Sequence, residues 1–168
     1  TYLGELDRHK TPRLEMIRSV IERAGMQPQV EDDIIATIWG KFVLNCSINP
    51  LCAIADLRPG HIREVEAFDE FQSKIIEEVL ALIEGKGVVL ADPDPLATIK
   101  AYSAKKFHRV SMQQHLLRER PTEIDSLNGY VARESERLGL KAPYNDALTR
   151  IVKGRQYQPE GEREHIPE

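Results

Sequence analysis

Three polar residues recur at intervals of four in a stretch that is otherwise apolar: Lys41, Asn45 and Asn49. With Ile38 at 0° on a helical wheel, they fall at about −60°, −20° and +20°, along the margin of the apolar face. Buried amides need hydrogen-bond partners, and partial desolvation lowers the pKa of a lysine, so that it can donate a proton near neutral pH. One interpretation of the row is a lysine that acts as a proton donor beside two buried amides that need hydrogen-bond partners. The alternative is a solvated lysine beside two turn-forming asparagines.

A second group of polar residues follows later in the chain: Ser111, Glu123, Asp125 and Asn128, near His108 and His115. Taken singly, Glu123 fits a helix start and Asn128 a packing notch. The histidines are seven residues apart, whereas metal-binding pairs on helices are usually three or four apart, so no metal site is expected. The basic residues here favour a solvated face, although they would also suit a carboxylate substrate. They are Lys105, Lys106, Arg109, Arg118 and Arg120.

Helical periodicity of the apolar residues extends over nearly the whole chain and must position both groups. Pro50 should end the helix that carries Lys41, because proline disfavours the helical conformation of the residue before it. Strand candidates are confined to 1–5 and 88–90, which are too short and too far apart to form a sheet. We therefore predict an all-α domain. Its helices are expected at about 12–24, 31–49, 61–84, 95–103, 106–118, 123–138 and 144–153, with a short turn after Pro50.

Composition excludes several classes of protein. The 168 residues carry 23 Lys and Arg against 27 Asp and Glu, a net charge of −4, which argues against a nucleic-acid partner. No segment approaches the roughly 18 consecutive apolar residues of a membrane span, and the start lacks an apolar leader, so a cytoplasmic location is the default expectation. Cys46 and Cys52 have no second pair and no histidine at metal spacing, so we expect buried free thiols.

Three segments, taken together, resemble a known family. They are residues 38–51 (IWGKFVLNCSINPL), 110–112 (VSM) and 121–129 (PTEIDSLNG). In this order they look like the helical C-terminal half of ketopantoate reductase (2-dehydropantoate 2-reductase), and the resemblance runs from about residue 1 to 153. It implies a helical bundle with the fold of the 6-phosphogluconate dehydrogenase C-terminal domain. Residues 1–10 would end the N-terminal dinucleotide-binding domain or form a linker, 11–154 the helical substrate and catalytic domain, and 155–168 a polar tail.

The resemblance also implies an activity: NADPH-dependent reduction of 2-dehydropantoate to (R)-pantoate, on the route to pantothenate and coenzyme A. By the motif match, Lys41 is the proton donor, Asn45, Asn49 and Ser111 contact the substrate, and Glu123 helps to hold the cofactor. No glycine-rich phosphate-binding loop follows a strand in this chain. NADPH would therefore be bound mainly by a Rossmann-type N-terminal domain, and the chain alone should be inactive. A homodimer is left open.

The chain departs from the family at three positions. His108 stands where many members carry asparagine, and Pro59 stands where some members carry a further substrate-contacting asparagine. His115 stands where an acidic residue is common. Exchange of buried hydrogen-bonding groups changes selectivity more than it changes the type of reaction. Two alternatives therefore stand beside ketopantoate reduction. One is a related reductase for another 2-oxo acid, and the other is a helical dimerisation or ligand-binding domain without catalysis.

Overall fold

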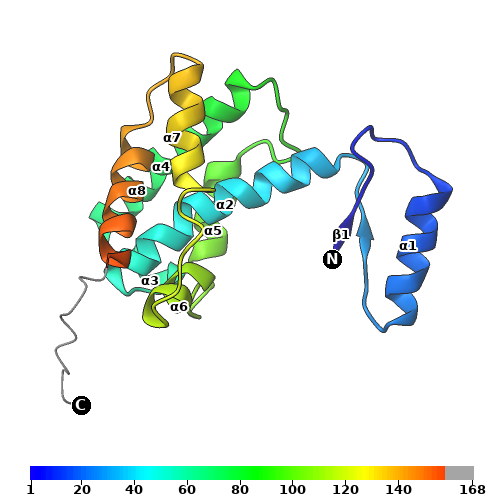
Figure 1. The fold of residues 1–168 in the computed structure, drawn as a ribbon, viewed down its shortest axis with the longest axis horizontal. Coiled ribbons are helices and arrows are strands. Elements are labelled where there is room, and N and C mark those ends of the chain that lie inside the picture. The colour runs from blue at the N-terminus through cyan, green and yellow to red at the C-terminus, as the bar shows by residue number, and fades with distance from the viewer. Residues whose placement is uncertain (158–168) are drawn as a thin grey trace.

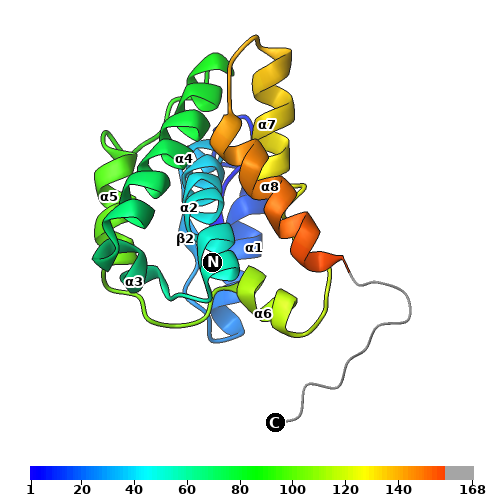
Figure 2. The ribbon, with the colours of Figure 1, turned by 90° about the vertical axis from the view of Figure 1, so that its left-hand side faces the viewer.

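Helix α2 (Ile34–Ala55) is the central element of the computed structural model, which describes residues 1–157. The Asp33 side chain starts the helix by accepting a hydrogen bond from the Ala36 amide at 3.0 Å. Helices α4, α6 and α8 pack around it, as the view along α2 in Figure 2 shows. These helices are Glu66–Gly85, Ser111–Leu117 and Pro143–Gln156. The all-α prediction is confirmed.

The other elements are shorter. The helices are α1 (Pro12–Arg23), α3 (Pro59–Glu64), α5 (Pro95–Ser103) and α7 (Asn128–Arg137). Within the described residues, strands occur only as β1 (Tyr2–Leu3) and β2 (Gln29–Val30). The predicted helices at 12–24 and 95–103 are confirmed, whereas residues 88–90 form no strand.

Helix α2 continues through Pro50, so its predicted end at 47–49 is wrong. A proline inside a helix leaves the carbonyl four residues earlier without its intrahelical donor, and here that carbonyl belongs to Cys46. The Asn128 amide from α7 donates to this oxygen at 3.0 Å. Because a side chain from another helix replaces the missing N–H, Asn45 and Asn49 lie on one continuous helix.

Other predicted boundaries are also corrected. The expected helix 61–84 is two helices, because Val65 adopts an extended conformation (φ −109°, ψ 105°) between α3 and α4. Helix α6 starts at Ser111 and α7 at Asn128, later than predicted, since irregular chain and turns precede both. Helix α8 extends to Gln156, which takes in the first two residues of the expected tail, and residues 158–168 lie outside the described part.

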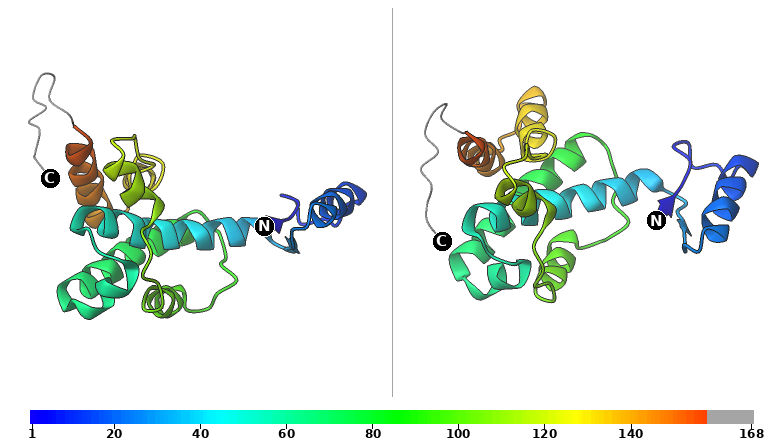
Figure 3. Two further views of the ribbon diagram at one scale, coloured as in Figure 1. Left: turned by 90° about the horizontal axis from the view of Figure 1, so that it is seen from below. Right: turned by 60° about the horizontal axis from the view of Figure 1, so that its bottom comes forward.

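The N-terminal elements form a unit of their own. Strands β1 and β2 pair in parallel, with Tyr2 opposite Gln29 and Leu3 opposite Val30, and α1 connects them. Figures 1 and 3 show this unit apart from the helical bundle, joined to it by the start of α2. The expected domain boundary between residues 10 and 11 falls inside this unit. On α1, Leu14 is buried, but Ile17 and Val20, which follow it at helical spacing, are exposed.

Although no membrane span is expected from the sequence, α2 is long and apolar enough to cross a membrane by length and composition alone. Half of the apolar window is buried in the structure. Its neighbours there are other helices of the bundle. A core helix passes the same test, so this property of α2 follows from its central position and is no sign of membrane insertion.

Candidate functional site

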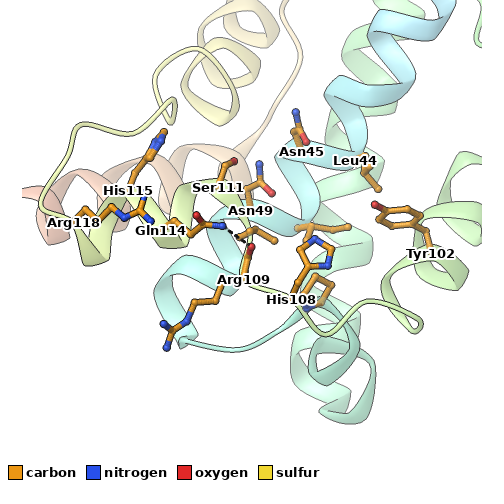
Figure 4. Close-up of a pocket in the computed structure, with 13 residues that line it drawn as sticks. Leu44, Asn45, Asn49, Tyr102, His108, Arg109, Ser111, Gln114, His115 and Arg118 are labelled. Atoms are coloured by element: carbon orange, nitrogen blue, oxygen red, sulfur yellow. Dashed lines mark hydrogen bonds between the residues drawn. The ribbon is translucent and has the colours of Figure 1, made fainter. Parts of the chain in front are cut away.

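A cavity of about 380 Å³ lies where α2 faces α6. Asn45 and Asn49 line it from α2 and Ser111 lines it from α6, as Figure 4 shows. A volume of this size lies within the range of small-molecule sites. Three of the predicted site residues, from two separate segments of the sequence, therefore share one cavity.

The polar side chains of Asn45, Asn49 and Ser111 are free to bind a ligand. Asn49 retains only 9% of its exposure. Within the described residues, no other protein group forms a hydrogen bond with the side chains of Asn45, Asn49 or Ser111. A poorly hydrated amide without a partner is costly, and a polar ligand that satisfies it recovers that cost. The cavity is thus suited to a small molecule with several hydrogen-bonding oxygen atoms.

Lys41 lies one helical turn away, in an adjoining groove of about 500 Å³. Leu44 and Tyr102 line both the groove and the cavity, so they separate the lysine from Asn49 and Ser111. The Lys41 side chain is exposed to solvent. The partial loss of water that we expected for it from the sequence is therefore not found in this structure. The structure therefore places Lys41 beside the cavity but not in its wall.

Glu123 also lies next to the cavity rather than in it. One of its carboxylate oxygens is 3.5 Å from Nδ1 of His115, which lines the cavity. The other two members of the second polar group have different surroundings: Asn128 is fully buried between helices, and Asp125 forms an ion pair with Lys153 at 3.1 Å. Of that group, only Ser111 lines the cavity itself.

Close packing of the start of α3 against residues 106–107 completes the cavity wall. The Gly60 amide donates to the Lys106 carbonyl at 2.8 Å, and a Cβ atom on Gly60 would lie 2.3 Å from the Phe107 ring. This approach, which requires glycine, brings Pro59 and His108 together in the wall. The resemblance to the family drew attention to Pro59 and His108, but no local signal in the sequence indicates the contact of Gly60 with residues 106–107.

Tyr102 is a further wall residue that the sequence analysis did not single out. Its helix, α5, is attached to α4 by the ion pair of Lys100 with Asp69 at 2.8 Å and by a hydrogen bond from Gln72 to Ser103 at 3.3 Å. Both contacts join residues 31 positions apart, which no periodicity reveals. Within the described residues, no group of three or more His, Cys, Asp or Glu side chains could hold a metal ion.

Comparison with known proteins identifies the helical part of the chain. Residues 33–156 match the family model described as ketopantoate reductase PanE/ApbA C terminal. The 2-dehydropantoate 2-reductase of Archaeoglobus fulgidus is 29% identical over 92% of this chain and 52% of its own length. That of Vibrio cholerae is 32% identical over 84% of this chain and 48% of its own length. The chain thus spans about half the length of these curated relatives.

Solved structures share the fold. The PanE/ApbA family ketopantoate reductase from Ralstonia eutropha superposes with a TM-score of 0.83 at 27% identity, over 92% of this chain and 50% of that one. A D-mandelate dehydrogenase in complex with NADH has a TM-score of 0.81 at 24% identity, over 92% of this chain and 53% of that one. The second likeness supports the fold alone.

Proposed function

Because this chain belongs to the ketopantoate reductase family, whose C-terminal domain its residues 33–156 match, we propose that it is the substrate-binding half of an NADPH-dependent 2-dehydropantoate 2-reductase. The observation that supports this most directly is the cavity in which Asn45, Asn49 and Ser111 converge, with Lys41 one turn away. The reaction would convert ketopantoate to (R)-pantoate, in the biosynthesis of pantothenate and coenzyme A, in the cytoplasm.

In this proposal, the side chains of the cavity hold the substrate and supply a proton. Asn45, Asn49 and Ser111 donate hydrogen bonds to its carboxylate and carbonyl oxygens. NADPH, when bound, supplies a hydride to the carbonyl carbon. The alkoxide that then develops needs an acid, and the Lys41 ammonium group donates the proton to it. The exposed Glu123 carboxylate, beside His115, can accept hydrogen bonds from hydroxyl groups of the cofactor.

The other half of the protein would be a Rossmann-type N-terminal domain. Three observations support such a partner: the chain covers about half of its curated relatives, the apolar face of α1 is exposed, and Lys41 faces an open groove. Contact with that domain would remove water from Lys41 and favour its role as an acid. The chain alone would then be inactive. Whether two copies associate as a homodimer stays a prediction.

The experiment that tests the proposal measures NADPH oxidation by the full-length parent protein with ketopantoate and other 2-oxo acids. We expect Lys41→Ala to lower kcat by about 10² or more, as loss of a general acid does. Lys105→Ala removes an exposed lysine that lines none of the cavities described above, and it should leave the rate unchanged. An unaltered kcat in Lys41→Ala would rule out the lysine as the proton donor.

The same experiment separates the alternatives. Pro59 and His108 line the cavity wall. They favour a related reductase with a different 2-oxo acid substrate, because the resemblance to the family implies an asparagine amide at each of these positions in other members. Reduction of another 2-oxo acid but not of ketopantoate would support that alternative. A parent protein that oxidises NADPH with none of these ketones would point to a helical binding or dimerisation domain.

A further inference from the structure

The cavity wall is basic beyond what the proposed reaction uses. It carries His108, Arg109, His115 and Arg118, and no aspartate or glutamate is among the residues that line it. Such an excess of cationic groups favours anionic ligands. The neutral donors Asn45, Asn49 and Ser111 suit the oxo-acid group common to all substrates of this type, so the cationic groups are left to recognise something else.

Arg118 follows two polar residues of α6, Ser111 and His115, that line the cavity. Ser111, His115 and Arg118 are spaced by four and three residues, so they lie on one face of the helix and its C-terminal end. In Figure 4, His115 and Arg118 lie at the end of the cavity away from Tyr102. Ser111 and Arg118 are separated by about 10 Å along the helix axis. A long arginine side chain and a substrate chain of a few carbon atoms can together span such a gap.

The charge of Arg118 is also available. Within the described residues, no carboxylate lies within ion-pair distance of its guanidinium group, whereas His115 has Glu123 at 3.5 Å. A guanidinium group binds a carboxylate through two parallel hydrogen bonds, which gives geometric selectivity as well as affinity.

We propose that Arg118 determines specificity by binding a second anionic group of the substrate, at the end remote from the ketone. The substrate class is then a dicarboxylic 2-oxo acid. This inference rests on the alternative form of the proposed function, a related reductase for a 2-oxo acid other than ketopantoate, because ketopantoate carries a single carboxylate.

The test compares two acids with the same five-carbon chain. In 2-oxoglutarate the chain ends in a carboxylate, and in 2-oxopentanoate it ends in a methyl group. We expect Arg118→Gln in the full-length parent to lower kcat/KM for 2-oxoglutarate at least tenfold and to change that for 2-oxopentanoate by less than twofold. The control Arg150→Gln removes the same charge from a solvent-exposed site on α8 and should change neither.

Several outcomes would overturn the inference. An equal loss for both acids would mean that Arg118 binds the carboxylate they share or, if the preference for NADPH over NADH is lost as well, a cofactor phosphate. No loss for either acid would mean that Arg118 contacts no ligand.

Calorimetry with glutarate and pentanoate separates this inference from the proposed function, because it needs no turnover. A parent protein that reduces no 2-oxo acid contradicts the proposed function. Even without turnover, the anion site is supported if Arg118→Gln binds glutarate more weakly than the native protein does while its binding of pentanoate is unchanged. Equal binding of glutarate by the native protein and the variant overturns it.

Discussion

Asn49 and Lys41 lie two turns apart on the same helix, yet their surroundings differ. Asn49 is buried where α2 meets α6, whereas Lys41 precedes that contact and faces an open groove. The buried amide of Asn49 is already poorly hydrated, so it loses little water when a ligand binds to it. The ammonium group of Lys41 stays hydrated until another protein surface covers it. The chemistry of each side chain thus depends on how far along α2 it lies.

The two cysteines provide a prediction about single residues. Cys46 and Cys52 are free and fully buried, which confirms the expectation of buried thiols. Burial raises the pKa of both, that of Cys52 to about 12. Because the thiolate is the reactive form, we expect neither thiol to react with Ellman's reagent in the folded chain at neutral pH. Both should react after unfolding in guanidinium chloride, and a rapid reaction of the folded chain would contradict this placement.

At the scale of elements, the central helix depends on a side chain from a distant helix. Asn128 donates to the Cys46 carbonyl that Pro50 leaves without a donor, and it also donates to the Asn145 side chain at 2.9 Å. Asn145 in turn donates to Glu78 at 2.7 Å, so one buried network joins α2, α4, α7 and α8. Asn128 uses its Nδ2 group for both of these contacts, while its buried Oδ1 atom has no partner among the described residues. A buried network of this kind specifies how the helices pack.

We expect Asn128→Ala to lower the free energy of unfolding by about 2–4 kcal/mol, since it leaves two buried acceptors unpaired. The loss should be smaller when Pro50→Ala is also present, because an alanine N–H can then donate to Cys46 within the helix. Urea denaturation of the native chain, the two single variants and the double variant measures this coupling. Strictly additive losses would show that Asn128 does not compensate for Pro50.

At the scale of the whole molecule, the N-terminal unit has an apolar surface that the bundle does not cover. Ile17 is 42% exposed and Val20 is 52% exposed, although their spacing is that of a buried helix face. A two-stranded sheet is marginally stable at best unless further strands or a helix pack against it. A contact with the proposed N-terminal domain would bury this face and extend the sheet.

Val20→Lys tests that contact. In the 168-residue chain alone, it should change the free energy of unfolding by less than about 0.5 kcal/mol, because the site is exposed there. In the full-length parent it should destabilise the protein by at least about 1 kcal/mol, because a charge would be buried against the other domain. Ser19→Lys on the same helix is the control. Equal effects of the two substitutions in the parent, measured by thermal unfolding, would count against burial of this face.

Local patterns in the sequence were sufficient for the all-α class, for the helix that bears Lys41, Asn45 and Asn49, and for the family, because periodicity and short motifs depend on neighbouring residues. Tertiary structure alone decided that α2 continues through Pro50, since the compensating amide of Asn128 lies 82 residues away. It also decided that Lys41 and Glu123 stay at the margin of the cavity that Asn45, Asn49 and Ser111 share. Contacts between distant segments determine which groups lose water and which lie side by side, and no pattern within one helix contains that information.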